Sequence, residues 1–169
     1  MTTDAMTELA ARVQRVEDEL EVRRVLLSYG PAADAGLSAR ATAGWLEDAE
    51  YDWDAARAPL EGRAGAAAML DGDRHQGLIA QGAAHFTGPA LVEIDGDHAT
   101  ALTYSMVMRR EPEERRWYLW RVSAVEWELA RVDGSWRIRR RTNRLLDESG
   151  AGRDLFASLM RSRFDLAPS

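Results

Sequence analysis

The side chains of this chain that could move protons at neutral pH are its histidines, acting together with acids and phenols. His85 lies in a mostly apolar stretch, Ala83 to Pro89, immediately ahead of the first long predicted strand, where an imidazole would form part of a pocket wall. An unperturbed imidazole titrates at about pH 6.5, so it can accept and return a proton when another group orients it. Asp34 is the candidate for that group, because a carboxylate fixes the tautomer and stabilises the imidazolium.

Aromatic side chains could bind a substrate beside this pair. Tyr29, Tyr51 and Tyr104 can aim phenolic donors at a carbonyl oxygen. A second interpretation stays open for each, since a tyrosine on an apolar face commonly packs in the core and a lone histidine is commonly a hydrogen-bonded wall residue. The side chains expected to contact the substrate are Trp53, Tyr104, Met106 and Trp127.

The other two histidines are weaker candidates. His98 follows a turn and is expected to be a solvated strand residue. His75 has Asp71 and Asp73 nearby, which could form a site for a hard cation, but Gly72 and Arg74 interrupt any known loop pattern for such a cation. The sequence therefore predicts no metal site.

The composition excludes several classes of chemistry. The chain has no cysteine, which excludes thiolate nucleophiles and disulfides, and all 22 basic residues are arginine, which excludes Schiff-base and P-loop lysines. G-x-S-x-G and G-x-G-x-x-G are also missing. We expect no organic cofactor.

Charge and hydropathy indicate the compartment and the classes of partner to expect. A net charge of −6 opposes binding to nucleic acid, and no run of about 18 apolar residues or signal-type segment occurs. The sequence predicts a cytoplasmic protein without nucleic-acid or membrane partners.

The elements that must position these residues are helices followed by strands. Apolar residues recur at helical spacing near the N-terminus, at Met6, Leu9, Val13, Val16 and Leu20, which predicts a first helix. A second helix is expected over Asp18 to Tyr29. Gly30-Pro31 then predicts a kink or a restart of the helix. Further expectations are a short helix from Ser38 through Leu46, an alanine-rich helix from Gly62 to about Leu70, and mostly loop or short helix over 71–88.

The second half of the chain is predicted to form β-strands. The β-prone runs are Ala90–Ile94, His98–Met108, Trp117–Arg131 and Ser135–Leu145, with turns at Asp95-Gly96 and Asp133-Gly134. Helices followed by a meander predict an α+β fold. The His98–Met108 strand is apolar on both faces, which predicts helices on one side and another subunit on the other.

The last hairpin allows a register prediction. A two-residue turn at Asp133-Gly134 pairs Glu128 with Arg139 and Glu126 with Arg141 on one face. The basic run 137–141 is then predicted to be a salt-bridged outer face. The core face is predicted to carry Val125, Trp127, Leu129, Trp136 and Ile138.

The whole pattern resembles the SnoaL-like group of the nuclear transport factor 2-like superfamily over about residues 14 to 146. The matching segments are Glu17 to Tyr29, Asp34, Trp45 to Asp52, Leu60 to Arg63, His85, Val92 to Ala99 and Val132 to Ile138. The resemblance implies one cone-shaped α+β barrel, with helices packed in a strongly curved, mostly antiparallel sheet around a deep pocket. It also implies a homodimer or homotrimer. We expect a single domain over 1–169, with 147–169 as a partly helical extension.

Members of this group include scytalone dehydratase, steroid isomerases, polyketide cyclases and many proteins of no known activity. The dehydratase-like pattern implies catalytic roles for Tyr29, Asp34, Tyr51 and His85. It also implies a histidine on the sheet, where this chain has Tyr104, Met106 or Met108, and an uninterrupted helix where this chain has Gly30-Pro31.

Two hypotheses remain. The first is a cofactor-independent lyase or isomerase, such as a dehydratase, that acts on a small steroid, polyketide or aromatic carbonyl compound in an apolar pocket. The second is a noncatalytic ligand-binding or assembly domain, in which Asp34 and His85 only satisfy buried polar groups.

Overall fold

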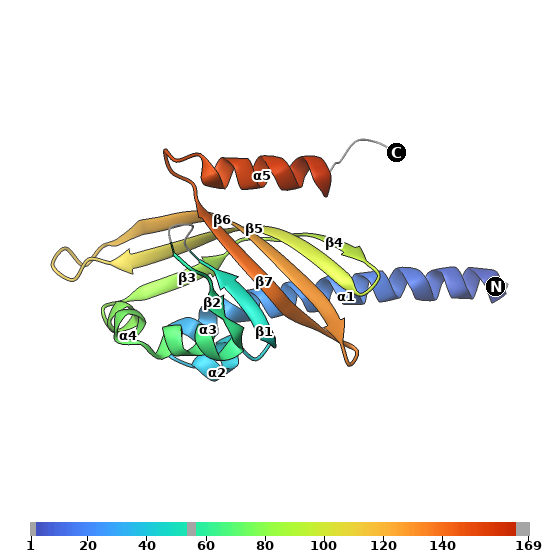
Figure 1. Ribbon diagram of the computed structural model, residues 1–169, viewed down its shortest axis with the longest axis horizontal. Coiled ribbons are helices and arrows are strands. Elements are labelled where there is room, and N and C mark those ends of the chain that lie inside the picture. The colour runs from blue at the N-terminus through green and yellow to red at the C-terminus, as the bar shows by residue number, and fades with distance from the viewer. Residues whose placement is uncertain (1–2, 54–56, 165–169) are drawn as a thin grey trace.

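A long helix, α1 (Thr3–Asp34), crosses one face of a curved sheet in the computed structural model of the protein, which describes residues 3–53 and 57–164 (Figure 1). The further helices are α2 (Ser38–Ala41), α3 (Gly62–Asp71), α4 (Asp73–Ala80) and α5 (Ala151–Ser162). The strands are β1 (Trp45–Asp52), β2 (Leu60–Glu61), β3 (Ala83–Thr87), β4 (Leu91–Asp95), β5 (His98–Arg110), β6 (Trp117–Val132) and β7 (Ser135–Leu145).

The strands form one seven-stranded sheet in the order β2-β1-β7-β6-β5-β3, and β4 pairs with the other end of β5. The pairs between described strands are antiparallel except for β1 and β7, which run parallel. The sheet stays open, with β2 and β3 at its ends. The predicted α+β architecture of helices packed on a curved, mostly antiparallel sheet is confirmed.

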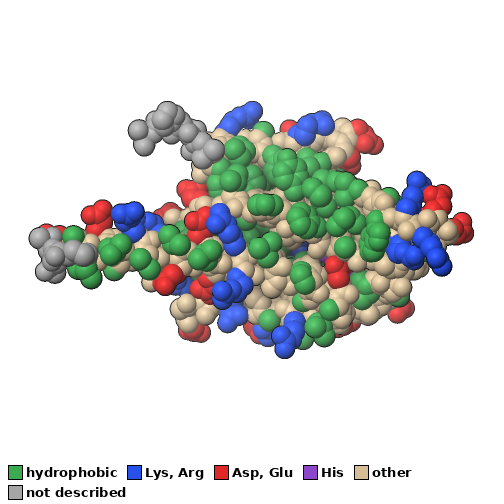
Figure 2. Space-filling model, turned by 180° about the vertical axis from the view of Figure 1, so that it is seen from behind, with side chains coloured by type: hydrophobic (Ala, Val, Ile, Leu, Met, Phe, Trp, Pro, Cys, Tyr) green, Lys and Arg blue, Asp and Glu red, His purple; other side chains and the backbone are tan. Residues whose placement is uncertain are grey.

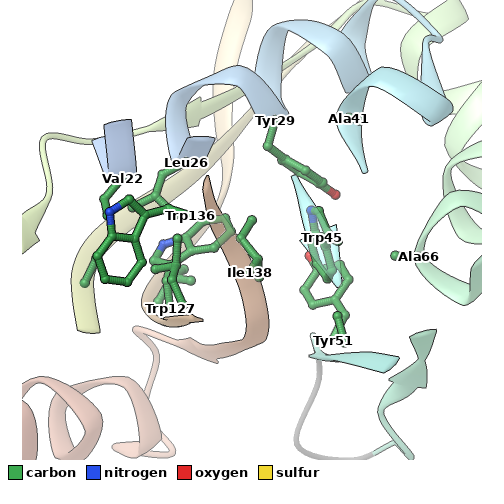
Figure 3. Packing of buried hydrophobic residues seen from close by; sticks show 14 of the residues in the cluster. Val22, Leu26, Tyr29, Ala41, Trp45, Tyr51, Ala66, Trp127, Trp136 and Ile138 are labelled. Atoms are coloured by element: carbon green, nitrogen blue, oxygen red, sulfur yellow. The ribbon is translucent and has the colours of Figure 1, made fainter. Parts of the chain in front are cut away.

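The core lies between α1 and the inner face of β6 and β7. Val22 and Leu26 of the helix pack against Trp127, Trp136 and Ile138 of the sheet, and all of them are fully or almost fully buried (Figure 3). Each such side chain contributes about 1.5–3 kcal/mol by leaving water. The predicted core face of the last hairpin is confirmed.

The predicted break at Gly30-Pro31 is wrong, because α1 continues through Pro31 to Asp34. Pro31 lies in the last turn, so its missing N–H removes only one helical hydrogen bond, to the carbonyl of Leu27. The helix ends at Asp34, and Gly36, two residues farther on, has a φ of +70° that lets Leu37 donate back to the carbonyl of Ala32.

The N-terminal half of α1 extends past the edge of the sheet (Figure 1). The residues at helical spacing are therefore in a helix, as predicted, but their side chains are exposed: Met6, Leu9, Val13, Val16 and Leu20. Among the described residues, no helix combines the length and the apolar composition needed to cross a membrane.

Several shorter predictions need correction. The helix at Ser38 ends at Ala41, and Trp45 begins strand β1, which lies between β2 and β7 inside the sheet. The alanine-rich helix is confirmed as α3. The short helix expected within 71–88 is present as α4, but the segment also contains the sheet strand β3, which was not expected.

A bulge between β6 and β7 changes the predicted register. Near the turn the pairing is as predicted, with Val132 opposite Ser135 and Leu129 opposite Ile138, but Glu128 pairs with Arg140 and not with Arg139. Arg139 is the extra residue, and it is exposed. Because one added residue inverts the inside–outside alternation, Arg141 points to the inner face. The prediction that it pairs with Glu126 on the outer face is wrong, since Trp127 is opposite Arg141.

The outer face of the sheet is covered in part by α5, on the side away from α1 (Figure 1). Leu102 packs with Leu159 and Phe164, and Tyr104 contacts the ring of Phe156 with centroids 4.8 Å apart. Apolar side chains remain visible beside α5 on this face (Figure 2). The two-sided apolar character of β5 is thus explained by α1 on one face and α5 on the other.

An ion pair ties α1 to the sheet. Arg131 of β6 donates from both terminal nitrogens to the two oxygens of Asp18, at 2.8 and 2.7 Å, and Trp136 Nε1 donates to the same carboxylate at 3.3 Å. The hydrogen bond from Arg131 is the main cause that lowers the pKa of Asp18 to about 2, although burial opposes it. The pair therefore contributes to stability when Asp18 is ionised.

We expect Asp18→Asn to lower the free energy of unfolding at pH 7 by about 2 kcal/mol, since each unit of pKa shift is worth about 1.4 kcal/mol. The contribution of a lowered carboxyl pKa is complete above the unfolded value of about 4 and is lost as the pH falls toward 2. Urea unfolding over this pH range measures it. Asp97→Asn, which removes an exposed partner of the same Arg131, should cost less than about 1 kcal/mol. Equal losses in the two variants, or a difference from wild type that does not shrink as the pH falls from 4 to 2, would contradict this role of Asp18.

Candidate active site

A cavity of about 270 Å³ lies between the inner face of the sheet and helices α1, α3 and α4. Its volume suits a ligand of about two fused rings. The lining residues that carry polar groups or large rings are Tyr29, Tyr51, Trp53, Arg57, Arg74, His75, His85, Ser105, Trp120, Arg121, Ser123, Arg141 and Asn143.

The structure brings Asp34 and His85 together at the wall of this cavity. Asp34 is the last residue of α1, and His85 is the central residue of β3. Oδ1 of Asp34 lies 2.5 Å from Nδ1 of His85, and Oδ2 accepts a hydrogen bond of 2.8 Å from the backbone N–H of the same histidine. Both oxygens hold one residue, so the imidazole has a defined orientation and Nε2 is the nitrogen left to act on a ligand. His85 was predicted ahead of the sheet, whereas it lies within it.

Gly30 allows the helix to approach β3 closely enough for this contact. A Cβ at Gly30 would lie 2.2 Å from the carbonyl oxygen of His85, far inside van der Waals contact. A residue with any side chain at this position would push α1 away from His85. The Gly30-Pro31 departure from the family pattern is thus compatible with an ordered Asp34.

Tyr29 and Tyr51 are buried neighbours in the lining of the cavity. Their neighbour Trp45 contacts both, with ring centroids 6.3 Å from Tyr29 and 5.5 Å from Tyr51 (Figure 3). Burial, followed by the effect of Tyr51, raises the pKa of Tyr29 well above its usual range. Tyr29 is therefore a neutral hydrogen-bond donor at physiological pH.

Arg141 is a cavity residue that the sequence misassigned. It is 2 % exposed, and it lies in register with Tyr51 of β1 on one side and Trp127 of β6 on the other. Its guanidinium is 4.5, 4.8 and 4.4 Å from the ring centres of Tyr29, Tyr51 and Trp127. Strict alternation along β7 places this side chain outside, and no local signal in the sequence marks the bulge at Arg139 that turns it inward.

His75 is a second histidine of the cavity, and the sequence did not single it out for this site. It is buried, its ring centre lies 5.4 Å from that of His85, and its Nδ1 is 2.9 Å from the carbonyl of Leu70. Because a carbonyl only accepts, Nδ1 carries the proton. Burial and then the charge of His85 lower the pKa of His75, so it is neutral at physiological pH. The solvated position predicted for His98 is confirmed.

The residues predicted to contact the substrate divide into three groups. Trp53 lines the cavity. Trp127 is fully buried behind Arg141, and its Nε1 donates to Thr103 at 3.0 Å. Tyr104 and Met106 alternate with the lining residues Ser105 and Val107 and so lie on the outer face of β5, which corrects their assignment to this pocket.

Among the described residues, no three side chains of histidine, aspartate or glutamate converge to hold a metal ion. Asp52 is buried and paired with Arg144 at 2.6 Å. The groups that the cavity brings together are the acid–base pair of Asp34 and His85, the phenols of Tyr29 and Tyr51, and the buried cation of Arg141.

Comparisons with known proteins identify the architecture. A family model described as the SnoaL-like domain matches residues 14–142. An NTF2-like protein with a cystatin-like fold from Novosphingobium aromaticivorans is 43 % identical, with a TM-score of 0.85 over 91 % of this chain and 98 % of that one. The resemblance inferred from the sequence is confirmed. The comparison with curated proteins found no match.

More distant solved structures share the fold. Rv3472 from Mycobacterium tuberculosis, a protein of unknown function, is 22 % identical, with a TM-score of 0.71 over 83 % of this chain and 79 % of that one. A proposed scytalone dehydratase from Novosphingobium aromaticivorans is 18 % identical, with a TM-score of 0.65 over 79 % of this chain and 87 % of that one.

Gly30→Ala should destabilise the protein although alanine is the better helix former by about 1 kcal/mol. The added methyl meets the backbone of His85 and has no free volume, and overpacking of this kind costs about 1–3 kcal/mol. Gly77→Ala is the matched control, because a Cβ there meets nothing within 4 Å, and it should be neutral or raise the melting temperature. Calorimetry on both variants decides, and a Gly30→Ala variant as stable as wild type would show that α1 does not need this close approach.

Proposed function

The chain belongs to the SnoaL-like domain family, and from this premise we propose that its cavity is the active site of a cofactor-independent lyase or isomerase. Its substrate is a small carbonyl compound; among the steroid, polyketide and aromatic types expected from the sequence, the cavity of about 270 Å³ favours a polyketide or aromatic compound of about two rings over a four-ring steroid. The observation that carries the proposal is the two-point contact between Asp34 and His85 at the wall of a cavity that Tyr29 and Tyr51 also line.

The first step is removal of a proton from the carbon next to the carbonyl. Nε2 of His85 accepts this proton, and the electron pair of the C–H bond moves into the carbonyl to give an enolate. Asp34, held on Nδ1 at 2.5 Å, stabilises the imidazolium that results. A positioned base of this kind contributes about 10²–10⁴-fold to the rate.

The second step uses the phenols and the proton now on His85. Tyr29 and Tyr51 donate hydrogen bonds to the enolate oxygen, for which the raised pKa of Tyr29 is suited because the group stays protonated. Protonated His85 then returns its proton. Delivery to a β-hydroxyl expels water and gives an unsaturated ketone, whereas delivery to another carbon isomerises the substrate.

His75 leaves the pairing of Asp34 with His85 undisturbed. Its imidazole is neutral and packs beside His85, so it does not compete for the negative charge of Asp34. A solved structure named as a proposed scytalone dehydratase shares the fold of this chain.

Proton exchange tests the first step without knowledge of the product. With a panel of cyclic aromatic ketones, neutral and carboxylate-bearing, the wild-type protein in D₂O should exchange the α-protons of at least one ketone, as followed by proton NMR. His85→Ala and Asp34→Asn should each slow the exchange at least about 100-fold. His98→Gln, at an exposed histidine, is the control and should leave it unchanged.

Two outcomes would reject the acid–base mechanism. One is exchange that survives in both His85→Ala and Asp34→Asn. The other is a wild-type protein that binds these ketones but exchanges none of them, which would favour the noncatalytic ligand-binding domain.

We also propose that copies of the chain associate through the outer face of the sheet, as a dimer or trimer. The support is the apolar surface beside α5 (Figure 2), together with a groove lined by the exposed side chains of Leu91, Tyr104 and Met160. Patches of this kind are characteristic of interfaces. Sedimentation equilibrium should give a dimer or trimer for wild type and a smaller species for Tyr104→Glu. A wild-type protein that stays monomeric at a protein concentration of about 100 μM would contradict the proposal.

A further inference from the structure

The cavity is strongly cationic, although the chain as a whole carries a net charge of −6. Its lining contains four arginines, Arg57, Arg74, Arg121 and Arg141. No aspartate or glutamate is among the lining residues in the part of the chain that the structure describes. Asp34 is the carboxylate nearest to the chemistry, and it is engaged by His85.

Arg141 is the most unusual of these cations because it is almost completely buried. Its Nε donates to Oδ1 of Asn143 at 3.1 Å, and three aromatic rings surround the guanidinium. Its Nη1 is buried without a hydrogen-bond partner, and no carboxylate of the described residues forms an ion pair with it. The Asn143 amide oxygen, the ring faces and the neighbouring Tyr29 hydroxyl compensate the lost hydration of this buried charge only in part, because none of them is an anion.

Two partly buried arginines of the same sheet, Arg131 and Arg144, show how this chain pairs a cation whose role is structural. Arg131 is paired with Asp18 at 2.7 Å, and Arg144 is paired with Asp52 at 2.6 Å. Both carboxylates are themselves buried. The cavity arginine lies on the same strand as Arg144 and lacks such a partner, so its charge is left for something that enters the cavity.

We propose that the substrate of this site is a small aromatic or alicyclic compound that carries a carboxylate, and that Arg141 binds this carboxylate. The inference rests on the proposed function and names the substrate class of the same site. A guanidinium suits the task because its planar N–H groups match the two oxygens of a carboxylate. Nη1 supplies a donor that is not used within the protein.

The surroundings of Arg141 define the rest of the ligand. The rings of Tyr29, Tyr51 and Trp127 form an apolar collar around the cation, so the carboxylate must be joined to a flat apolar body rather than to a polar chain. The cavity volume of about 270 Å³ limits that body to about two rings. Arg74 over the ring of Trp53, and Arg121, add positive charge that favours entry of an anion.

A matched pair of probes tests the inference without any turnover. 2-Naphthoate and 2-naphthamide have the same shape, and only the first carries a negative charge. Isothermal titration should show that the wild-type protein binds 2-naphthoate at least about tenfold more tightly than 2-naphthamide, because a charge-assisted pair in a dry site is worth more than a neutral hydrogen bond.

The variants assign this preference to one side chain. Arg141→Gln should lower the affinity for 2-naphthoate at least about tenfold and change that for 2-naphthamide by less than about threefold. Arg140→Gln is the control on the same strand, because Arg140 is paired with Glu50 at 3.0 Å and lies outside the cavity lining, and it should bind both probes as wild type does.

The inference is overturned if wild type binds the two probes equally, if it binds 2-naphthoate undetectably, or if Arg140→Gln and Arg141→Gln lower the affinity alike. The wild-type comparison decides even if Arg141→Gln does not fold. His85→Ala should keep the preference for 2-naphthoate. A preference that is kept while α-proton exchange is absent would therefore refute the catalytic proposal and leave the carboxylate site standing.

Discussion

The contact between the Asp34 carboxylate and His85 is the interaction on which the rest of the site depends. One oxygen holds Nδ1 of the ring and the other holds the backbone N–H of the same residue, so the carboxylate joins the end of α1 to β3 as well as orienting an imidazole. This arrangement requires the helix to pass within contact distance of the strand backbone, which Gly30 permits. The packing of α1 on β3 and the orientation of the His85 imidazole therefore depend on the same contact, so a change that displaces α1 also frees the His85 ring.

Near the contact between Asp34 and His85, the inner face of the sheet serves both as part of the apolar core and as the wall of a polar cavity. The inner face of the sheet supplies an apolar core beneath α1, yet a few residues farther along β7 it presents a buried guanidinium to a cavity. The bulge at Arg139 separates the two, because it inverts the alternation between Ile138 and Arg141. One added residue in β7 is thus enough to place a charged side chain on an otherwise apolar inner face.

Much of the fold and part of the site could be predicted from the sequence. Periodicity indicated the helices and the long strands, and the Asp133-Gly134 turn set the register as far as Leu129. Asp34 and His85 could be paired because an imidazole needs an orienting acid and the family pattern suggested both. Arg141 and His75 were not found, because their burial depends on a bulge and on the packing of α4, and neither has a signature in local sequence. Tyr104 and Met106 were misplaced because β5 is apolar on both faces, and the sequence does not say which face meets α1.

The tautomer of His85 tests the central claim most directly. In a protein labelled with ¹⁵N-histidine, long-range ¹⁵N–¹H NMR at neutral pH distinguishes a protonated ring nitrogen from an unprotonated one. We expect His85 to carry its proton on Nδ1, hydrogen-bonded to Asp34, with Nε2 unprotonated and able to accept a proton from a ligand. A neutral ring protonated on Nε2 would mean that Asp34 does not orient the imidazole as a base, and would contradict the proposed acid–base role of the pair.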